Sequence, residues 1–200
     1  MVDLLKTPHQ LKQFKEFLQA LAVMMKQHNP YTYLHQEQVA NLARTIAKEM
    51  GLSPERVACI YYGSLVHDIG KIQISEDILN KPGSLDVEEF DLIKTHCDKG
   101  YEVIKNVTFP CDVSSIILQH HERCDGSGYP RGLKGDAMTL EARIVAVADV
   151  VEAMSFDRPY RRALGIDIAL DEIIQNRGKL YDPDVVDACV KLFKEKRFTF

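Results

Sequence analysis

The sequence predicts an all-α fold built as a single compact domain. Apolar residues recur at helical spacing along almost the whole chain, and no internal repeat or convincing linker divides it. The 200 residues, of which 46% are hydrophobic and 27% charged, suffice to bury one core and match the usual size of one domain. Two stretches rich in glycine and proline, 80–83 and 125–132, interrupt the helical pattern. The second is too long for a simple turn, and loops of that length are often functional.

The helices are predicted in order from this periodicity and from end signals. Gly51 provides a natural end for a helix over about 33–50. Ser53 as N-cap and Pro54 at the first helical position then begin a helix that runs towards His67. The same apolar spacing predicts the remaining helices at about 11–27, 86–106, 112–121, 140–155, 167–176 and 184–195.

Charge and hydropathy exclude two classes of partner. A net charge of -4 and a pI near 6.0 argue against a binder of polymeric nucleic acid, which normally carries a basic surface. No apolar run approaches the roughly 20 residues needed to cross a bilayer. The first residues do not resemble a signal peptide, because Asp3 and Lys6 interrupt them. We expect no membrane contact by this chain.

The cysteines give no sign of a disulfide framework or of a thiolate metal site. They are five in number, scattered, and form no CxxC pair. A reducing compartment, the cytoplasm, is the location we expect.

Histidines and aspartates gather in a pattern typical of metal binding. Five of the seven histidines lie inside or at the end of predicted helices: His35, His67, His96, His120 and His121. A lone helical histidine is most often structural. The neighbouring pairs His67-Asp68 and His120-His121 are harder to explain in that way, because two adjacent polar side chains rarely both belong to a core.

Asp149 lies in an apolar segment, 144–151, that is predicted to be fully buried. Burying an unpaired carboxylate there would cost roughly several kcal/mol unless a cation compensates its charge. A metal ion could supply that charge. A buried ion pair with Arg143 or Arg158 is the alternative.

Imidazole and carboxylate donors without thiolates suit iron, manganese, zinc or nickel. Six or more ligands imply at least two ions, and an aspartate that bridges them would hold them about 3.5 to 4 Å apart. We choose Asp68 as this bridge.

Two motifs carry a resemblance to a known family. Residues 67–71, His-Asp-Ile-Gly-Lys, resemble the HDxGK signature of HD-domain phosphohydrolases. Residues 120–130 resemble the HHExxDGxGYP signature of the HD-GYP subfamily. The resemblance continues through Lys81-Pro82-Gly83, residues 143–149 and residues 158–161, and covers about residues 31 to 190.

The resemblance implies an HD-domain helical bundle with a GYP loop beside a di-metal site. Family members bind two or three metals, commonly iron, and hydrolyse cyclic di-GMP to linear pGpG or on to GMP. In this chain we expect a hydroxide that bridges the metals to attack the phosphorus. Residues 31–200 would form the catalytic domain, and residues 1–30 an N-terminal helix that could link to an upstream domain. The implied first metal site consists of His35, His67, Asp68 and Asp149. The implied second site consists of Asp68, His96, His120 and His121.

Tyr31 sets the expected number of metals. Members with a third ion have a glutamate one helical turn before the first histidine, and Tyr31 stands there. A phenol with an ordinary pKa of about 10 is a poor ligand near neutral pH. We therefore predict two divalent ions and expect Tyr31 to pack or hydrogen-bond beside them.

The resemblance also implies the residues that act on substrate. Lys71 and Asp68 would be catalytic, Lys71 by offering a cation or a proton to the reacting phosphate. The substrate would be bound by Lys71, Gly128, Tyr129, Arg158 and Arg161. Glu122 could orient one of the histidine ligands or form a surface ion pair.

The main hypothesis is hydrolysis of cyclic di-GMP. One alternative is a sensor that binds cyclic di-GMP without turnover, and another is an HD phosphohydrolase for a different cyclic dinucleotide. Expected partners are an upstream sensory or receiver domain and GGDEF-type signalling proteins, while a homodimer is left open.

Overall fold

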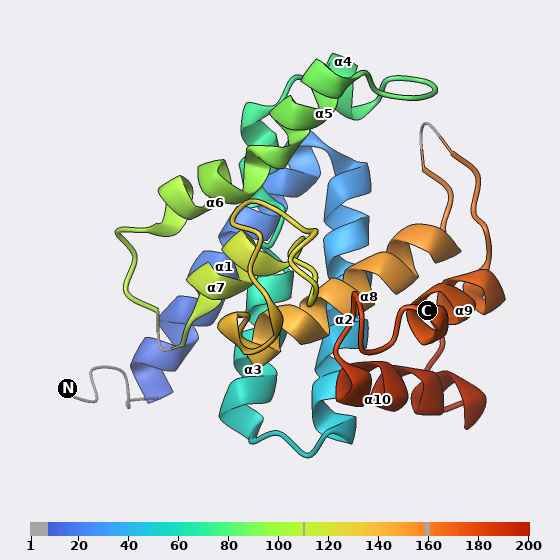
Figure 1. The fold of residues 1–200 in the computed structure, drawn as a ribbon. Helices are drawn as coiled ribbons and strands as arrows, with labels where there is room; N and C mark the ends of the chain where they lie inside the picture. Colours follow the sequence, from blue (N-terminus) through green and yellow to red (C-terminus); the bar gives the residue numbers. More distant parts are fainter. Residues whose placement is uncertain (1–7, 110, 159–160) are drawn as a thin grey trace.

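The regular elements of the protein are helices throughout the part that the computed structural model describes, residues 8–109, 111–158 and 161–200 (Figure 1). The predicted all-α class is confirmed. Residues 1–7 of the expected N-terminal segment, and Pro159 and Tyr160 of the arginine motif, lie outside the described residues. Among the described residues, no helix is long and apolar enough to cross a membrane.

Each predicted helical segment corresponds to helix in the structure. The elements in chain order are α1 (Pro8–His28), α2 (Pro30–Glu49), α3 (Pro54–Ser64), the 3-10 turn η1 (Ile69–Gln73), α4 (Glu76–Leu79), α5 (Val87–Lys94), α6 (His96–Ile104), α7 (Val113–Gln119), the 3-10 turn η2 (Gly135–Ala137), α8 (Leu140–Ser155), α9 (Ile166–Gln175) and α10 (Pro183–Lys194).

Polar caps define where the helices begin. Ser53 caps α3 and Pro54 follows it, as predicted. Asn29 caps α2 in the same manner, its side chain accepting from the Thr32 N–H at 2.9 Å. The turn before Pro30 therefore fixes the register of the helix that carries His35.

The segment 86–106, predicted as one helix, is two helices that meet at Thr95. The Thr95 hydroxyl donates to the Leu92 carbonyl, and the His96 ring donates to the Ile93 carbonyl, each at 2.6 Å. These side chains occupy carbonyls that a continuous helix would use for its own ladder. The helix from Pro54 is also shorter than predicted, because it ends at Ser64.

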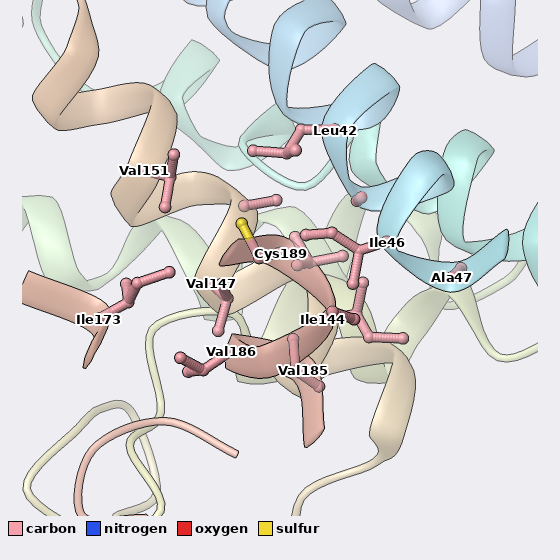
Figure 2. Packing of buried hydrophobic residues seen from close by; sticks show 14 of the residues in the cluster. Leu42, Ile46, Ala47, Ile144, Val147, Val151, Ile173, Val185, Val186 and Cys189 are labelled. Atoms are coloured by element: carbon pink, nitrogen blue, oxygen red, sulfur yellow. The ribbon is translucent and has the colours of Figure 1, made fainter. Parts of the chain in front are cut away.

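The main core surrounds α8, which crosses the middle of the molecule (Figure 1). Figure 2 shows Leu42 and Ile46 of α2 on one side of this helix and Val186 of α10 on another. Both Ile144 and Val147 are completely buried. Because α8 is enclosed by other helices, Asp149 lies within the core, as its apolar neighbours predicted.

A second apolar cluster joins α1, α3 and α7, and it contains a disulfide. Cys59 and Cys111 are bonded, with their Cα atoms 6.0 Å apart. The expectation that no cysteines pair is therefore wrong. The two residues are 52 positions apart, and their spacing in the sequence carries no information about the packing that brings them together. The cysteine pattern consequently does not support a reducing compartment.

Candidate metal centre and substrate cleft

All seven predicted metal ligands converge in the interior. They come from α2, α6, α8 and the turns that follow α3 and α7. Their donor atoms form two groups, and within each group these atoms lie within 4.8 Å of one another. One group is Asp68, His96, His120 and His121, and the other is His35, His67 and Asp149.

Asp68 lies between the two groups. Its Oδ2 atom is 3.6 Å from Nε2 of both His35 and His67. Its Oδ1 atom is 3.3 Å from Nε2 of His96 and 3.8 Å from Nε2 of His120. Each carboxylate oxygen thus faces a different set of imidazoles, which is the position that the bridging role requires.

Backbone carbonyls fix the orientation of three of these rings. Nδ1 of His67 donates to the Ser64 carbonyl at 2.6 Å, and Nδ1 of His120 donates to the Ile117 carbonyl at 2.9 Å. The same kind of bond joins His96 to Ile93. Because a carbonyl oxygen can only accept, Nδ1 carries the hydrogen and the Nε2 lone pair points into the cluster.

The donor set fits divalent transition metals. Nε2 of His67 and Oδ1 of Asp68 are buried without a hydrogen-bond partner, an arrangement that is costly unless a ligand satisfies them. Burial lowers the pKa of His67 to about 3 and also lowers that of His96. Burial alone would raise the pKa of Asp68, but Lys71 and His67 hold it well below its usual value. Neutral imidazoles and an ionised carboxylate are the forms that bind metal.

Among the described residues, Asp149 forms no ion pair with an arginine, so the alternative of a buried ion pair with Arg143 or Arg158 is wrong. Arg143 instead pairs with Asp182 at 2.7 Å. The Asp149 Oδ1 atom lies 3.1 Å from Nε2 of His35. Its carboxylate therefore belongs to the histidine cluster.

Glu152 is a residue of the centre that the sequence analysis missed. Its Oε2 atom accepts from Nδ1 of His35 and from the Arg158 guanidinium, each at 2.5 Å. The signal was present, because a second acid three residues after Asp149 lies on the same face of a buried helix. The Arg158 side chain is only 9% exposed and lies over the Tyr31 ring at 5.4 Å. The predicted phosphate-binding arginine thus contacts the centre from within the protein.

The GYP loop folds back onto its own histidines. Glu122 is completely buried and accepts from the N–H groups of Arg131 and Leu133 at 2.7 and 3.0 Å. It therefore anchors the loop, and both roles predicted for it are wrong. A Cβ at Gly128 would lie 2.4 Å from the His121 carbonyl oxygen. The close approach that Gly128 permits is to the protein backbone.

A cleft of about 750 Å³ opens beside the centre. Its lining includes His121 and the predicted substrate-binding residues Lys71, Tyr129 and Arg161. Lys71 Nζ lies 2.6 Å from Asp68 Oδ2, and this neighbour raises the pKa of Lys71 although burial opposes it. The rest of the lining is Ile78, Leu79, Gly83, Ser84, Leu85, Asp86, Val87, Phe90 and Ile93.

The family described as HD domain matches residues 19–185. The chain belongs to the HD-domain family. This HD-domain chain is 43% identical over 182 residues to a cyclic di-GMP phosphodiesterase of Thermotoga maritima. The aligned region covers 90% of the chain and 50% of that protein. It is 42% identical to the cyclic di-GMP phosphodiesterase response regulator RpfG of Xanthomonas campestris, over 88% of the chain and 47% of that protein. It is 38% identical to the 3'3'-cGAMP-specific phosphodiesterase 1 of Vibrio cholerae, over 86% of the chain and 40% of that protein. The chain thus spans about half the length of these curated relatives or less.

Solved structures share the fold. The HD domain of the Listeria monocytogenes phosphodiesterase PgpH aligns with a TM-score of 0.63 and 22% identity, over 89% of this chain and 99% of that one. An HDG"Y"P protein of Bdellovibrio bacteriovorus, Bd1817, aligns with a TM-score of 0.67 and 24% identity, over 80% of this chain and 51% of that one. The HD-domain bundle expected from the HDxGK and GYP motifs is confirmed.

Proposed function

We propose that this HD-domain chain is a metal-dependent phosphodiesterase that hydrolyses cyclic di-GMP to linear pGpG or on to GMP. The observation that carries the proposal is the Asp68 carboxylate, which lies between two groups of donor atoms and contacts Lys71, a cation that lines the cleft. The names of the relatives at 42–43% identity support this substrate.

The proposed chemistry assigns a role to each side of the centre. His35, His67, Asp68 and Asp149 would hold one divalent cation, and Asp68, His96, His120 and His121 the other. When bound, the cations activate water and neutralise the phosphate oxygens. Lys71 keeps its proton beside Asp68, so that Nζ can stabilise developing charge or protonate the leaving oxygen. Tyr129 and Arg161 line the cleft where the remaining parts of the nucleotide would lie.

The test is product analysis after incubation of purified, metal-reconstituted protein with cyclic di-GMP, 3'3'-cGAMP and cyclic di-AMP under anaerobic conditions. We expect cyclic di-GMP to be hydrolysed fastest, and Asp68→Asn to lower the rate at least about a hundredfold. Asp171→Asn, an exposed acid on α9, serves as the control. Binding of cyclic di-GMP without turnover would mean that the protein is a sensor of this nucleotide. Faster hydrolysis of 3'3'-cGAMP would mean that its substrate is the one named for its Vibrio cholerae relative.

The same proposal has finer parts. We infer that the two cations are iron, with manganese, zinc or nickel as substitutes. Metal analysis that finds three ions per chain would contradict the count inferred from Tyr31. We also propose that residues 31–200 work as the catalytic domain in the bacterial cytoplasm, downstream of a sensory or receiver domain and alongside GGDEF-type proteins.

A further inference from the structure

The mouth of the cleft is formed by residues 76–94, here called the outer wall, which includes α4 and α5. No residue in either helix is buried. The outer wall nevertheless directs six apolar side chains to the cleft, namely Ile78, Leu79, Leu85, Val87, Phe90 and Ile93. Val87 is 73% exposed and Phe90 is 45% exposed. These side chains are therefore not part of a core, and an apolar ligand surface accounts for them.

Polar contacts hold the outer wall in position. Lys81 pairs with Glu89 at 2.5 Å. The Glu89 side chain also accepts from the Asp86 N–H, while Asp86 accepts from the Glu89 N–H, which together form a capping box at the start of α5. The loop through Pro82 is thus tied to the helix that carries Phe90. The surface it presents is defined before any ligand binds.

An aromatic path leads from the metal centre to this wall. The Tyr129 ring stacks on His121, with ring centroids 4.7 Å apart and an angle of 27°. The Phe90 ring meets Tyr129 edge to face at 6.3 Å. Lys94 Nζ lies 4.7 Å from the Phe90 centroid. Phe90 is where the path reaches solvent, and it is the aromatic side chain of the cleft with the most accessible surface.

The cleft is therefore divided by chemistry. On the side of the metal centre it is lined by His121 and by Lys71, which contacts Asp68, whereas most of the side chains that the outer wall contributes are apolar. A cyclic dinucleotide has the same division, because its phosphodiesters lie in the central ring and its bases project outward. A phosphate bound at the centre would direct a base towards the outer wall.

We propose that Phe90 is a specificity-determining residue that stacks with a purine base of the substrate. The proposal rests on the proposed function, because it takes a cyclic dinucleotide as the ligand. Stacking on an aromatic side chain tolerates different bases, so Phe90 would favour nucleotides over phosphodiesters that lack a base.

The experiment compares Phe90→Ala with Leu92→Ala, an exposed apolar residue of α5 that does not line the cleft. We expect Phe90→Ala to raise KM and Kd for cyclic di-GMP about tenfold, the loss typical of one base stack, with kcat almost unchanged. The Kd of inorganic phosphate, which carries no ring that could stack on Phe90, should be unaffected. Phe90→Trp should restore binding, and Leu92→Ala should behave as the unmodified protein.

Each outcome separates the two proposals. If the unmodified protein binds cyclic di-GMP without hydrolysing it, the proposed phosphodiesterase function is contradicted. The ratio of the Kd values of Phe90→Ala and the unmodified protein still tests the role of Phe90. An unchanged Kd and KM in Phe90→Ala would overturn the assignment. An equal loss of affinity for cyclic di-GMP and for inorganic phosphate, or a change in oligomeric state by sedimentation, would also overturn it, because Phe90 would then serve folding or self-association.

Discussion

At the scale of single residues, His35 is the proposed ligand whose surroundings are most specific. Nδ1 of His67, His96 and His120 donates to neutral carbonyls, whereas Nδ1 of His35 donates to the carboxylate of Glu152. A charged acceptor strengthens the bond and makes the imidazole a better donor to metal. Arg158 compensates the buried charge of Glu152. Glu152 and Arg158 thus modulate how strongly His35 would bind a metal, without being among the proposed ligands themselves.

Replacing Glu152 with glutamine keeps the shape and removes the charge. We predict that Glu152→Gln weakens metal binding about 10- to 100-fold, because the partners of histidine ligands typically contribute that much. Metal titration by calorimetry measures the change. Glu141→Gln, on the same helix but paired with Arg56 near the surface, is the control. Equal affinity in both variants would show that His35 needs only a neutral acceptor.

At the scale of elements, the distance between η1 and α6 places Asp68 near His96. A Cβ at Gly70 would lie 1.9 Å from the His96 carbonyl oxygen and 2.5 Å from the Gly100 nitrogen. Since these neighbours are backbone atoms, no side chain can move aside. The glycine of the HDxGK motif is therefore required for the two elements to pack.

Gly70→Ala is predicted to lower the free energy of unfolding by about 3 kcal/mol or more, since the elements must separate. Gly51→Ala is the comparison, because a Cβ there meets no atom and only the positive φ of 72° opposes it. Its cost should be about 1 to 2 kcal/mol. Urea denaturation measures both values, and equal losses would contradict the packing argument.

Elements were predictable from local sequence only in part. Apolar periodicity located the helices, and Ser53-Pro54 located the start of α3 correctly. The break at Thr95 was not predictable, because it depends on side chains that take carbonyls away from the helix. Periodicity reports which face is buried and says little about where the axis turns.

At the scale of the whole molecule, the C-terminal end is tied to α2 through Glu49. Its carboxylate pairs with Lys191 at 2.8 Å and with Arg197 at 2.5 Å. The hydrogen bond from Arg197, followed by that from Lys191, lowers the pKa of Glu49 to about 2. An acid with a lowered pKa stabilises the fold above its unfolded pKa, and this contribution is lost as the pH falls.

We predict that unmodified protein and Glu49→Gln differ most in Tm above about pH 4.5, and that the difference shrinks as the pH falls towards about 2. Thermal unfolding across this range, followed by circular dichroism, measures the difference. High salt should reduce it, because the pairs are near the surface. A difference that does not depend on pH would mean that Glu49 acts through packing.

The metal centre was more predictable than its supports. The family resemblance, with the buried position of Asp149, implied all seven residues that the structure brings together. Tertiary packing alone determines that Arg158 reaches Glu152, that Glu122 anchors the loop, and that Cys59 meets Cys111. These contacts join residues that are not related by any helical or turn spacing, so a single sequence does not display them.

The contrast between α8 and the outer wall has an evolutionary consequence. Asp149 belongs to a helix enclosed by the core, so a change there would disturb both the proposed metal site and folding. The outer wall has no buried residue in α4 or α5, and exposed substitutions usually change stability by no more than about 0.5 kcal/mol. Selection can therefore vary the mouth of the cleft while the centre stays constant. A lineage with this fold can acquire new substrates without first acquiring a more stable protein.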